Sequence, residues 1–123
     1  VYKALKELEK DRVRELIMTM PLHSKLVLLA IYDLIKDGGK TTTGEVYTRY
    51  KHLCQTLGIE SVTQRRVSDI ISELDMIGII NAQLVSRGRY GKTRFLSLAV
   101  AGNIVLETLG EDPYIAPLLS GDR

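Results

Sequence analysis

Residues 62–98 read VTQRRVSDIISELDMIGIINAQLVSRGRYGKTRFLSL, and this stretch decides the fold. In its first part, residues 63–77, apolar side chains recur at the spacing of one helical face, at Val67, Ile70, Ile71 and Leu74. In its second part, two β-prone runs at 79–85 and 93–98 flank a loop whose two glycines permit a tight turn. A helix followed directly by a hairpin predicts the last helix and the wing of a winged helix-turn-helix.

The predicted helix has defined ends and two different faces. Thr63 is a favourable N-cap, and Gly78 stops the helix at its other end. At about 100° per residue, the side chains opposite the apolar stripe are Arg65, Asp69, Ser72 and Met76, with Arg66 on the flank. The arginine pair therefore lies in the first turn of the exposed face.

The remaining chain supplies the other parts of this fold. Its periodicity predicts helices over 2–18, 22–37, 43–57 and 103–109, a minimal strand at 40–42 and a further helical turn within 112–119. The most apolar helix, 22–37, is expected to be the central core helix, and Thr42 with Glu45 has the form of a capping box. The predicted fold class is therefore mainly α with a small β-hairpin (α+β), arranged as a winged helix-turn-helix.

Length and composition fit one domain of a longer protein. The 123 residues are 45% hydrophobic and 26% charged, which suits a globular domain with its own core. The chain opens with Val1 instead of Met and in helical sequence, which indicates an excised fragment. We expect residues 1–20 to form a helix that links to a missing upstream module, 21–100 to form the winged-helix domain, and 101–123 to form a C-terminal helical extension and tail.

The net charge of +2 is small, but the basic residues are concentrated in the hairpin loop, which has four of them and no acid between residues 87 and 94. Charge of one sign on one element is the electrostatic footprint of a nucleic-acid-binding surface. Arginines beside a glycine suit entry into the minor groove, an exposed tyrosine suits a sugar or phosphate contact, and the residues that follow suit phosphates. The candidate DNA-binding residues of the wing are Arg87, Gly88, Arg89, Tyr90, Lys92, Thr93 and Arg94.

The start of the predicted last helix carries a second set of candidates. Gln64 and Arg65 suit bidentate contacts to adenine and guanine in the major groove. Thr63, Arg66 and Ser68 suit phosphates or flanking bases, and the helix N-terminus adds backbone donors. Acids occupy later exposed positions of this helix and repel phosphate, so we expect only its first two turns to enter the groove.

Three alternative interpretations remain open at this point. The helix face and hairpin could be ordinary solvated surface. A winged-helix transcription regulator would bind a promoter half-site as a dimer, and a winged-helix protein-interaction module would touch protein with its wing. Salt-sensitive affinity for duplex DNA separates the DNA-binding interpretations from the protein-interaction module.

Enzymatic chemistry has little support in the sequence. Gly38-Gly39-Lys40-Thr41 contains part of a phosphate-binding P-loop, but Leu34 stands where the motif needs its first glycine, and a helix precedes it instead of a strand. The histidines and Cys54 lack the number and spacing of zinc ligands. We predict no catalytic site, no metal and no cofactor in this chain.

The compartment follows from what the chain contains. A single cysteine allows no internal disulfide and suits a reducing environment. No apolar run approaches the roughly 18–20 residues of a membrane span. We therefore predict a cytoplasmic, nucleoid-associated protein without a membrane partner.

The runs PLHSKLVLLAIYDL, TTGEVYTRYKHLCQTLGIE, VTQRRVSDIISELDMIGII and VSRGRYGKTRFLSL resemble the C-terminal winged-helix domain of archaeal replication initiators, over residues 21–98. These initiators are related to both the eukaryotic origin recognition complex and the cell division control ATPase. The resemblance implies double-stranded origin DNA as the partner, with other initiator copies and the replicative helicase as further partners. It also implies an upstream AAA-plus ATPase module that uses ATP and magnesium. The family's DNA-contacting elements correspond to residues 63–68 and 87–92 of this chain.

Overall fold

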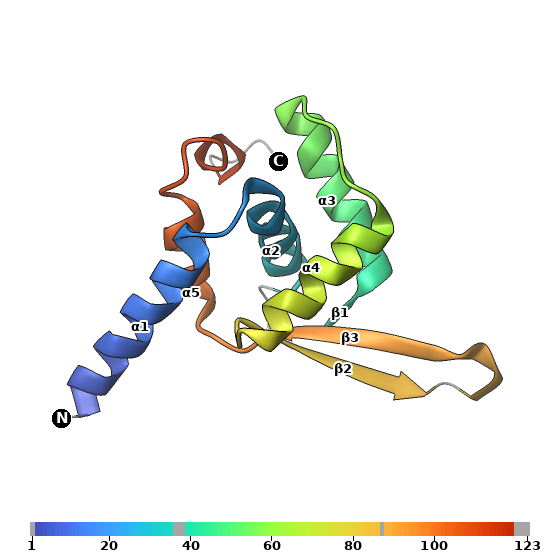
Figure 1. Ribbon diagram of the computed structural model, residues 1–123, viewed down its shortest axis with the longest axis horizontal. Coiled ribbons are helices and arrows are strands. Elements are labelled where there is room, and N and C mark those ends of the chain that lie inside the picture. Colours follow the sequence, from blue (N-terminus) through green and yellow to red (C-terminus); the bar gives the residue numbers. More distant parts are fainter. Residues whose placement is uncertain (1, 36–38, 87, 120–123) are drawn as a thin grey trace.

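The computed structural model describes residues 2–35, 39–86 and 88–119 (Figure 1). Within these ranges the chain forms five α-helices, three strands and two 3-10 turns, in the order that the sequence pattern predicts. The helices are α1 (Tyr2–Met18), α2 (Leu22–Ile35), α3 (Thr43–Leu57), α4 (Gln64–Met76) and α5 (Gly102–Leu109). The strands are β1 (Thr41–Thr42), β2 (Ile80–Ser86) and β3 (Lys92–Leu98), and the 3-10 turns are η1 (Gly88–Tyr90) and η2 (Ala116–Leu119).

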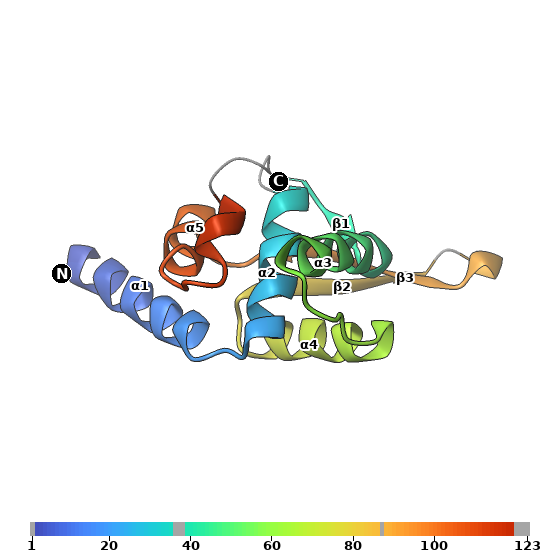
Figure 2. The same cartoon turned by 90° about the horizontal axis from the view of Figure 1, so that it is seen from above.

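Helix α2 lies at the centre of the molecule, with α1 and α5 on one side and α3 and α4 on the other (Figures 1 and 2). Its residues 24–31 are all buried, which confirms the prediction of a core helix covered on more than one side. The sequence places apolar side chains around nearly the whole circumference of α2. For this reason the helix needs neighbours on several sides, and α3, α4, α5 and strand β3 supply them.

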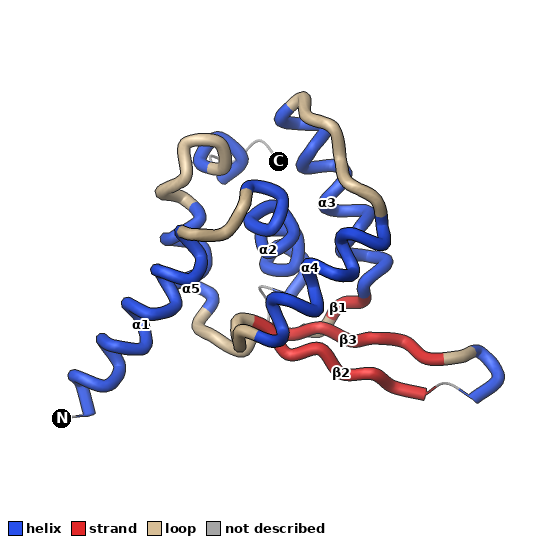
Figure 3. The backbone as a smooth tube through the Cα atoms, viewed as in Figure 1, coloured by secondary structure: helices blue, strands red, loops and turns tan. Residues whose placement is uncertain are grey.

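The sheet has the strand order β1-β3-β2, and both pairings are antiparallel. Strand β1 is so short that it pairs with β3 only at Thr41↔Leu96 and Thr42↔Phe95. Beyond Phe95 the sheet continues as the two-stranded ribbon of β2 and β3, which runs past the helices as the wing (Figure 3). The strands reach to Ser86 and Lys92, so the wing loop is shorter than the sequence pattern predicts.

Two hydrogen-bonded caps fix the helix-turn-helix. The capping box of α3 is present, because the Thr42 hydroxyl accepts the Glu45 amide and the Glu45 carboxylate accepts the Thr42 amide. At the start of α4, the Thr63 hydroxyl accepts the amide of Arg66 at 3.1 Å. Both N-caps confirm positions predicted from the sequence, and the second one determines where the arginine pair is presented.

The segments before and after the winged-helix elements belong to the same core. Helix α1 packs against α5 (Figure 1), and buried apolar side chains from both flanks join the core cluster, among them Ile17, Val105, Leu109, Ile115 and Leu118. Ion pairs Arg14–Glu111 and Lys25–Asp112 connect α1 and α2 to the chain that follows α5. Both flanking segments therefore pack on the same core as residues 21–100.

Within the described ranges, none of the helices combines the length and the apolar character that crossing a membrane demands.

Candidate nucleic-acid interface

The exposed face of α4 presents its predicted DNA-binding side chains to solvent. Thr63, Gln64, Arg65 and Arg66 are exposed, and Ser68 is half-buried. The opposite face is buried through Val67, Ile70, Ile71 and Leu74, as the periodicity predicts. The helix is therefore held firmly on one side while its first turn stands free to meet a ligand on the other.

The acids of α4 have different surroundings, and only some of them oppose a phosphate. Glu73 lies 3.6 Å from the Arg66 guanidinium, and both side chains are about half exposed, at 58% and 48%. Asp75 instead accepts the backbone N–H of Ala82 at 3.1 Å and thereby ties the end of α4 to β2. Asp75 thus has a structural role, whereas Glu73 pairs with the Arg66 guanidinium at the surface.

The wing places its predicted residues along one projecting ribbon. Gly88, Arg89 and Lys92 are exposed, and Thr93 is half-buried. Gly88 and Gly91 have φ values of +64° and +85°, which glycine adopts without the strain of a Cβ, so the turn explains both glycines. Of the other candidates, Arg87 and the side chain of Tyr90 lie outside the described residues.

Arg94 is half-buried at the root of the wing, where other residues of the protein accept its hydrogen bonds. Its Nη2 donates to the carbonyl of Ser68 at 3.1 Å and to the Ser68 hydroxyl at 2.8 Å. Its Nη1 donates to the Ser72 hydroxyl at 2.8 Å, and its Nε donates to the Thr43 hydroxyl at 3.4 Å. Arg94 and Ser68, which the sequence offers as DNA contacts, are therefore partners of each other.

Sequence reasoning missed Ser72 and Thr43 as parts of this network. Ser68 and Ser72 are four residues apart, so their side chains stack on one edge of α4. That spacing was the only signal available, and it did not reveal which distant cation would meet the two hydroxyls. The residues lining the concave surface between α3, α4 and the wing are Thr42, Thr43, Gly44, Ser68, Leu84, Lys92, Thr93 and Arg94.

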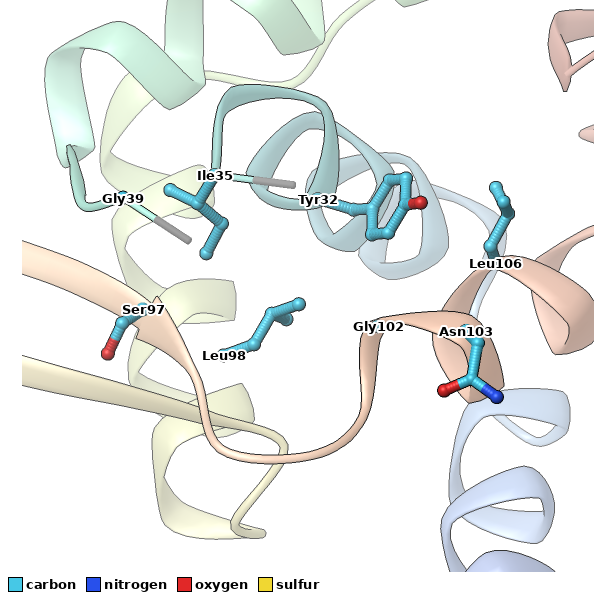
Figure 4. A pocket seen from close by; sticks show the side chains of 8 residues that line it. All are labelled: Tyr32, Ile35, Gly39, Ser97, Leu98, Gly102, Asn103 and Leu106. Atoms are coloured by element: carbon cyan, nitrogen blue, oxygen red, sulfur yellow. The ribbon is translucent and has the colours of Figure 1, made fainter. Parts of the chain in front are cut away.

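A second hollow lies away from this face, where the end of α2 meets β3 and α5 (Figure 4). Among the described residues that line it are Tyr32, Leu98, Asn103 and Leu106, and none of the described lining residues is a carboxylate, lysine, arginine, histidine or cysteine. Across the described ranges there is no group of three or more His, Cys, Asp or Glu side chains that could hold a metal ion.

Residues 15–108 match the family model described as the C-terminal winged helix domain of CDC6. The chain belongs to this family. Membership confirms both the predicted winged-helix class and the resemblance to the winged-helix domain of archaeal replication initiators. The described helices and the small three-stranded antiparallel sheet agree with it.

Curated relatives extend the similarity across almost the whole chain. The ORC1-type DNA replication protein 1 of Aeropyrum pernix is 58% identical over 120 residues, which cover 97% of this chain and 30% of that protein. The protein of the same name from Sulfolobus acidocaldarius is 57% identical over 121 residues, covering 98% of this chain and 30% of that protein. The chain thus spans about a third of the length of these relatives.

Solved structures show the same fold. The structure of the Aeropyrum pernix ORC1 protein in complex with DNA matches with a TM-score of 0.91 and 57% identity, over 96% of this chain and 31% of that one. The structure of Drosophila ORC bound to DNA matches with a TM-score of 0.68 at 20% identity, over 88% of this chain and 27% of that one. The second match shows the shared fold alone, because its sequence identity is low.

Proposed function

We propose that this domain binds double-stranded DNA as part of a DNA replication initiator that recognises replication origins. Helix α4 enters the major groove with its first two turns, and the wing reaches the minor groove and the neighbouring phosphates. This proposal joins the predicted contacts of the two elements into one surface. Family membership favours a replication initiator over a transcription regulator.

One observation carries the proposal: the N-terminal end of α4 and the tip of the wing, each with exposed cations, lie toward the same end of the molecule. The N-terminal end of α4 and the tip of the wing point in the same direction (Figures 1 and 2). On these two elements Arg65, Arg66, Arg89 and Lys92 are all exposed. A helix and a ribbon with basic side chains at this relative placement fit adjacent grooves of a duplex.

The similarity to a DNA-bound relative supports the same conclusion independently. The Aeropyrum pernix protein was solved in complex with DNA, and its backbone agrees with this chain almost throughout. The backbone elements that we propose to meet the DNA are therefore arranged alike in the two proteins. The individual contacts assigned to Thr63, Gln64 and the wing residues are proposals for this chain.

The whole protein does more than this domain. We propose an upstream AAA-plus module that binds ATP and magnesium, other initiator copies and the replicative helicase as partners, and a cytoplasmic location on the nucleoid. Because part of the DNA contact would come from that module, the isolated domain binds DNA more weakly and less selectively than the intact protein.

A salt titration tests the proposed function. The affinity of the domain for a short duplex, measured by fluorescence anisotropy, should fall with a log–log slope of about −4 for four or five phosphate contacts. Arg12→Ala is the matched control, because Arg12 is an exposed arginine on α1, on the opposite side of the molecule from the wing. This variant should keep both the affinity and the slope. Absence of salt-sensitive affinity for any duplex would favour a protein-interaction module.

A further inference from the structure

The wing loses its support at one residue. Strand β1 braces β3 only as far as Phe95, so the ribbon beyond it consists of two strands. A two-stranded ribbon is marginal by itself and twists easily. Going from the core toward the wing tip, Arg94 is the first residue of β3 that no longer has β1 beside it. Leu96, two residues nearer the core on the same face of β3, is buried. Arg94 therefore stands where the wing leaves the body of the protein.

The Arg94 guanidinium connects this point to both helices of the helix-turn-helix. It reaches Thr43 at the start of α3, and Ser68 and Ser72 on the edge of α4. Four of its five N–H groups are used in these bonds, with the carbonyl of Ser68 as the fourth acceptor. A planar fork bound to two separate helices restrains the direction of the ribbon far more than a single hydrogen bond would.

All four acceptors are neutral, which distinguishes this network from an ordinary structural ion pair. The positive charge of Arg94 is therefore retained at the surface between α4 and the wing, while its N–H groups face inward. In this arrangement the guanidinium adds to the local potential but has only one N–H group left for a phosphate.

We propose that Arg94 is a positioning residue that fixes the wing relative to α4 and thereby sets the spacing between the major-groove and minor-groove contacts. The proposal rests on the proposed function and deepens it. A wing already held at the binding angle loses less conformational entropy when DNA is bound. We call the hydrogen bonds of Arg94 to Thr43, Ser68 and Ser72 the clasp. Without the clasp, the wing contacts of Arg89 and Lys92 no longer add fully to the contacts of α4.

The test compares variants that keep a positive charge at position 94 but remove hydrogen bonds of the guanidinium group. Arg94→Lys retains a cation, and the double variant Thr43→Val with Ser72→Ala retains Arg94 itself while removing two acceptors. The positioning role predicts that both variants weaken duplex binding, with Arg94→Lys losing about tenfold. A direct phosphate contact predicts nearly wild-type affinity for both, because a cation remains in place.

A double-mutant cycle with the wing tip separates positioning from a general effect on folding. Arg89→Ala should weaken binding by about tenfold in the wild type. It should weaken binding by less than about threefold in the Arg94→Lys background, because the unclasped wing already contributes less. An equal loss from Arg89→Ala in both backgrounds would overturn the proposal.

Amide hydrogen exchange in the absence of DNA measures the clasp without relying on the proposed function. In both clasp variants, exchange should rise at residues 83–86 and 92–93 while residues 80–82 and 96–98, which lie nearer the core, stay protected. Uniform faster exchange would show a loss of global stability and overturn a local positioning role. If the wild type fails to bind duplex DNA, the proposed function fails, and the exchange pattern still decides whether Arg94 orders the wing.

Discussion

The buried ion pair between Lys25 and Asp112 should be one of the main supports of this domain. Lys25 Nζ lies 2.7 Å from Asp112 Oδ2, and the two side chains are only 10% and 11% exposed. Asp112 Oδ1 also accepts the backbone N–H of Tyr114 at 2.7 Å. The pair joins α2 to the chain after α5, so its removal should loosen the C-terminal segment from the core.

Asp112→Ala should be more damaging than Lys25→Met. Replacing Asp112 leaves an ammonium group buried without its counter-charge, which costs about 3 kcal/mol. For a chain of this length, such a loss lowers Tm by about 12 °C. Lys25→Met leaves a carboxylate that still accepts the amide of Tyr114, so its cost should be smaller. Urea unfolding followed by circular dichroism at neutral pH gives both free energies of unfolding.

The neighbouring exposed ion pair provides the control. Arg14 and Glu111 also connect an N-terminal helix to the chain after α5, but their side chains are 36% and 43% exposed. Glu111→Gln should therefore leave the free energy of unfolding close to the wild-type value. If Asp112→Ala costs no more than Glu111→Gln does, the burial of the Lys25–Asp112 pair does not matter and the reasoning is refuted.

The Lys25–Asp112 pair also makes the stability of the fold depend on pH in the acidic range. Burial raises the pKa of Asp112, but the Lys25 ammonium and the backbone amides of Tyr114 and Ile115 together outweigh it and hold this pKa below the ordinary 3.8. A lowered folded-state pKa contributes stability above the unfolded value, and that stability is lost as pH falls through the folded pKa. Asp112→Asn should therefore flatten the loss of stability below about pH 4. An unchanged acid profile in this variant would contradict the assignment.

Two further changes test the surroundings of α4. Glu73→Gln should raise DNA affinity about two- to threefold, because it releases Arg66 and removes a charge that repels phosphate. Glu15→Gln on α1 is the control and should leave the affinity unchanged. Equal effects of the two variants in anisotropy titrations would show that the pairing of Glu73 with Arg66 is not the cause. Tyr50→Phe should lower the free energy of unfolding by about 1–3 kcal/mol, because the buried Tyr50 hydroxyl accepts the amide of Val62 just before α4. Thermal unfolding measures this second effect, and a wild-type Tm would show that the hydrogen bond is dispensable.

The helices and the core were predictable because their signals are local. The apolar stripe of α4, the capping box at Thr42 and the stop at Gly78 depend on residues within a few positions of one another. Helix α2 could be placed at the centre since its apolar surface exceeds what one neighbour can cover. These features follow from periodicity and capping chemistry, which do not require the tertiary structure.

The network around Arg94 was not predictable, because its partners are distant in the sequence. Arg94 lies 22, 26 and 51 residues from Ser72, Ser68 and Thr43. In the sequence, Arg94 and Ser68 have the residue types of DNA contacts, and only in the folded protein does the side chain of Arg94 reach Ser68 on the edge of α4. Lys25 is a similar case, since its counter-ion is 87 residues away. Polar side chains at the surface of a predicted element therefore need the fold before they can be assigned to a ligand.

The most direct test of the central claim is the affinity of Arg65→Ala and Arg89→Ala for duplex DNA, measured beside Arg12→Ala. If α4 and the wing form the DNA-binding surface, Arg65→Ala and Arg89→Ala should each weaken binding by about 1–3 kcal/mol. The variant that loses a base contact should also discriminate less between sequences, and Arg12→Ala should bind as the wild type does. Wild-type affinity in both Arg65→Ala and Arg89→Ala would place the DNA on another face of the domain.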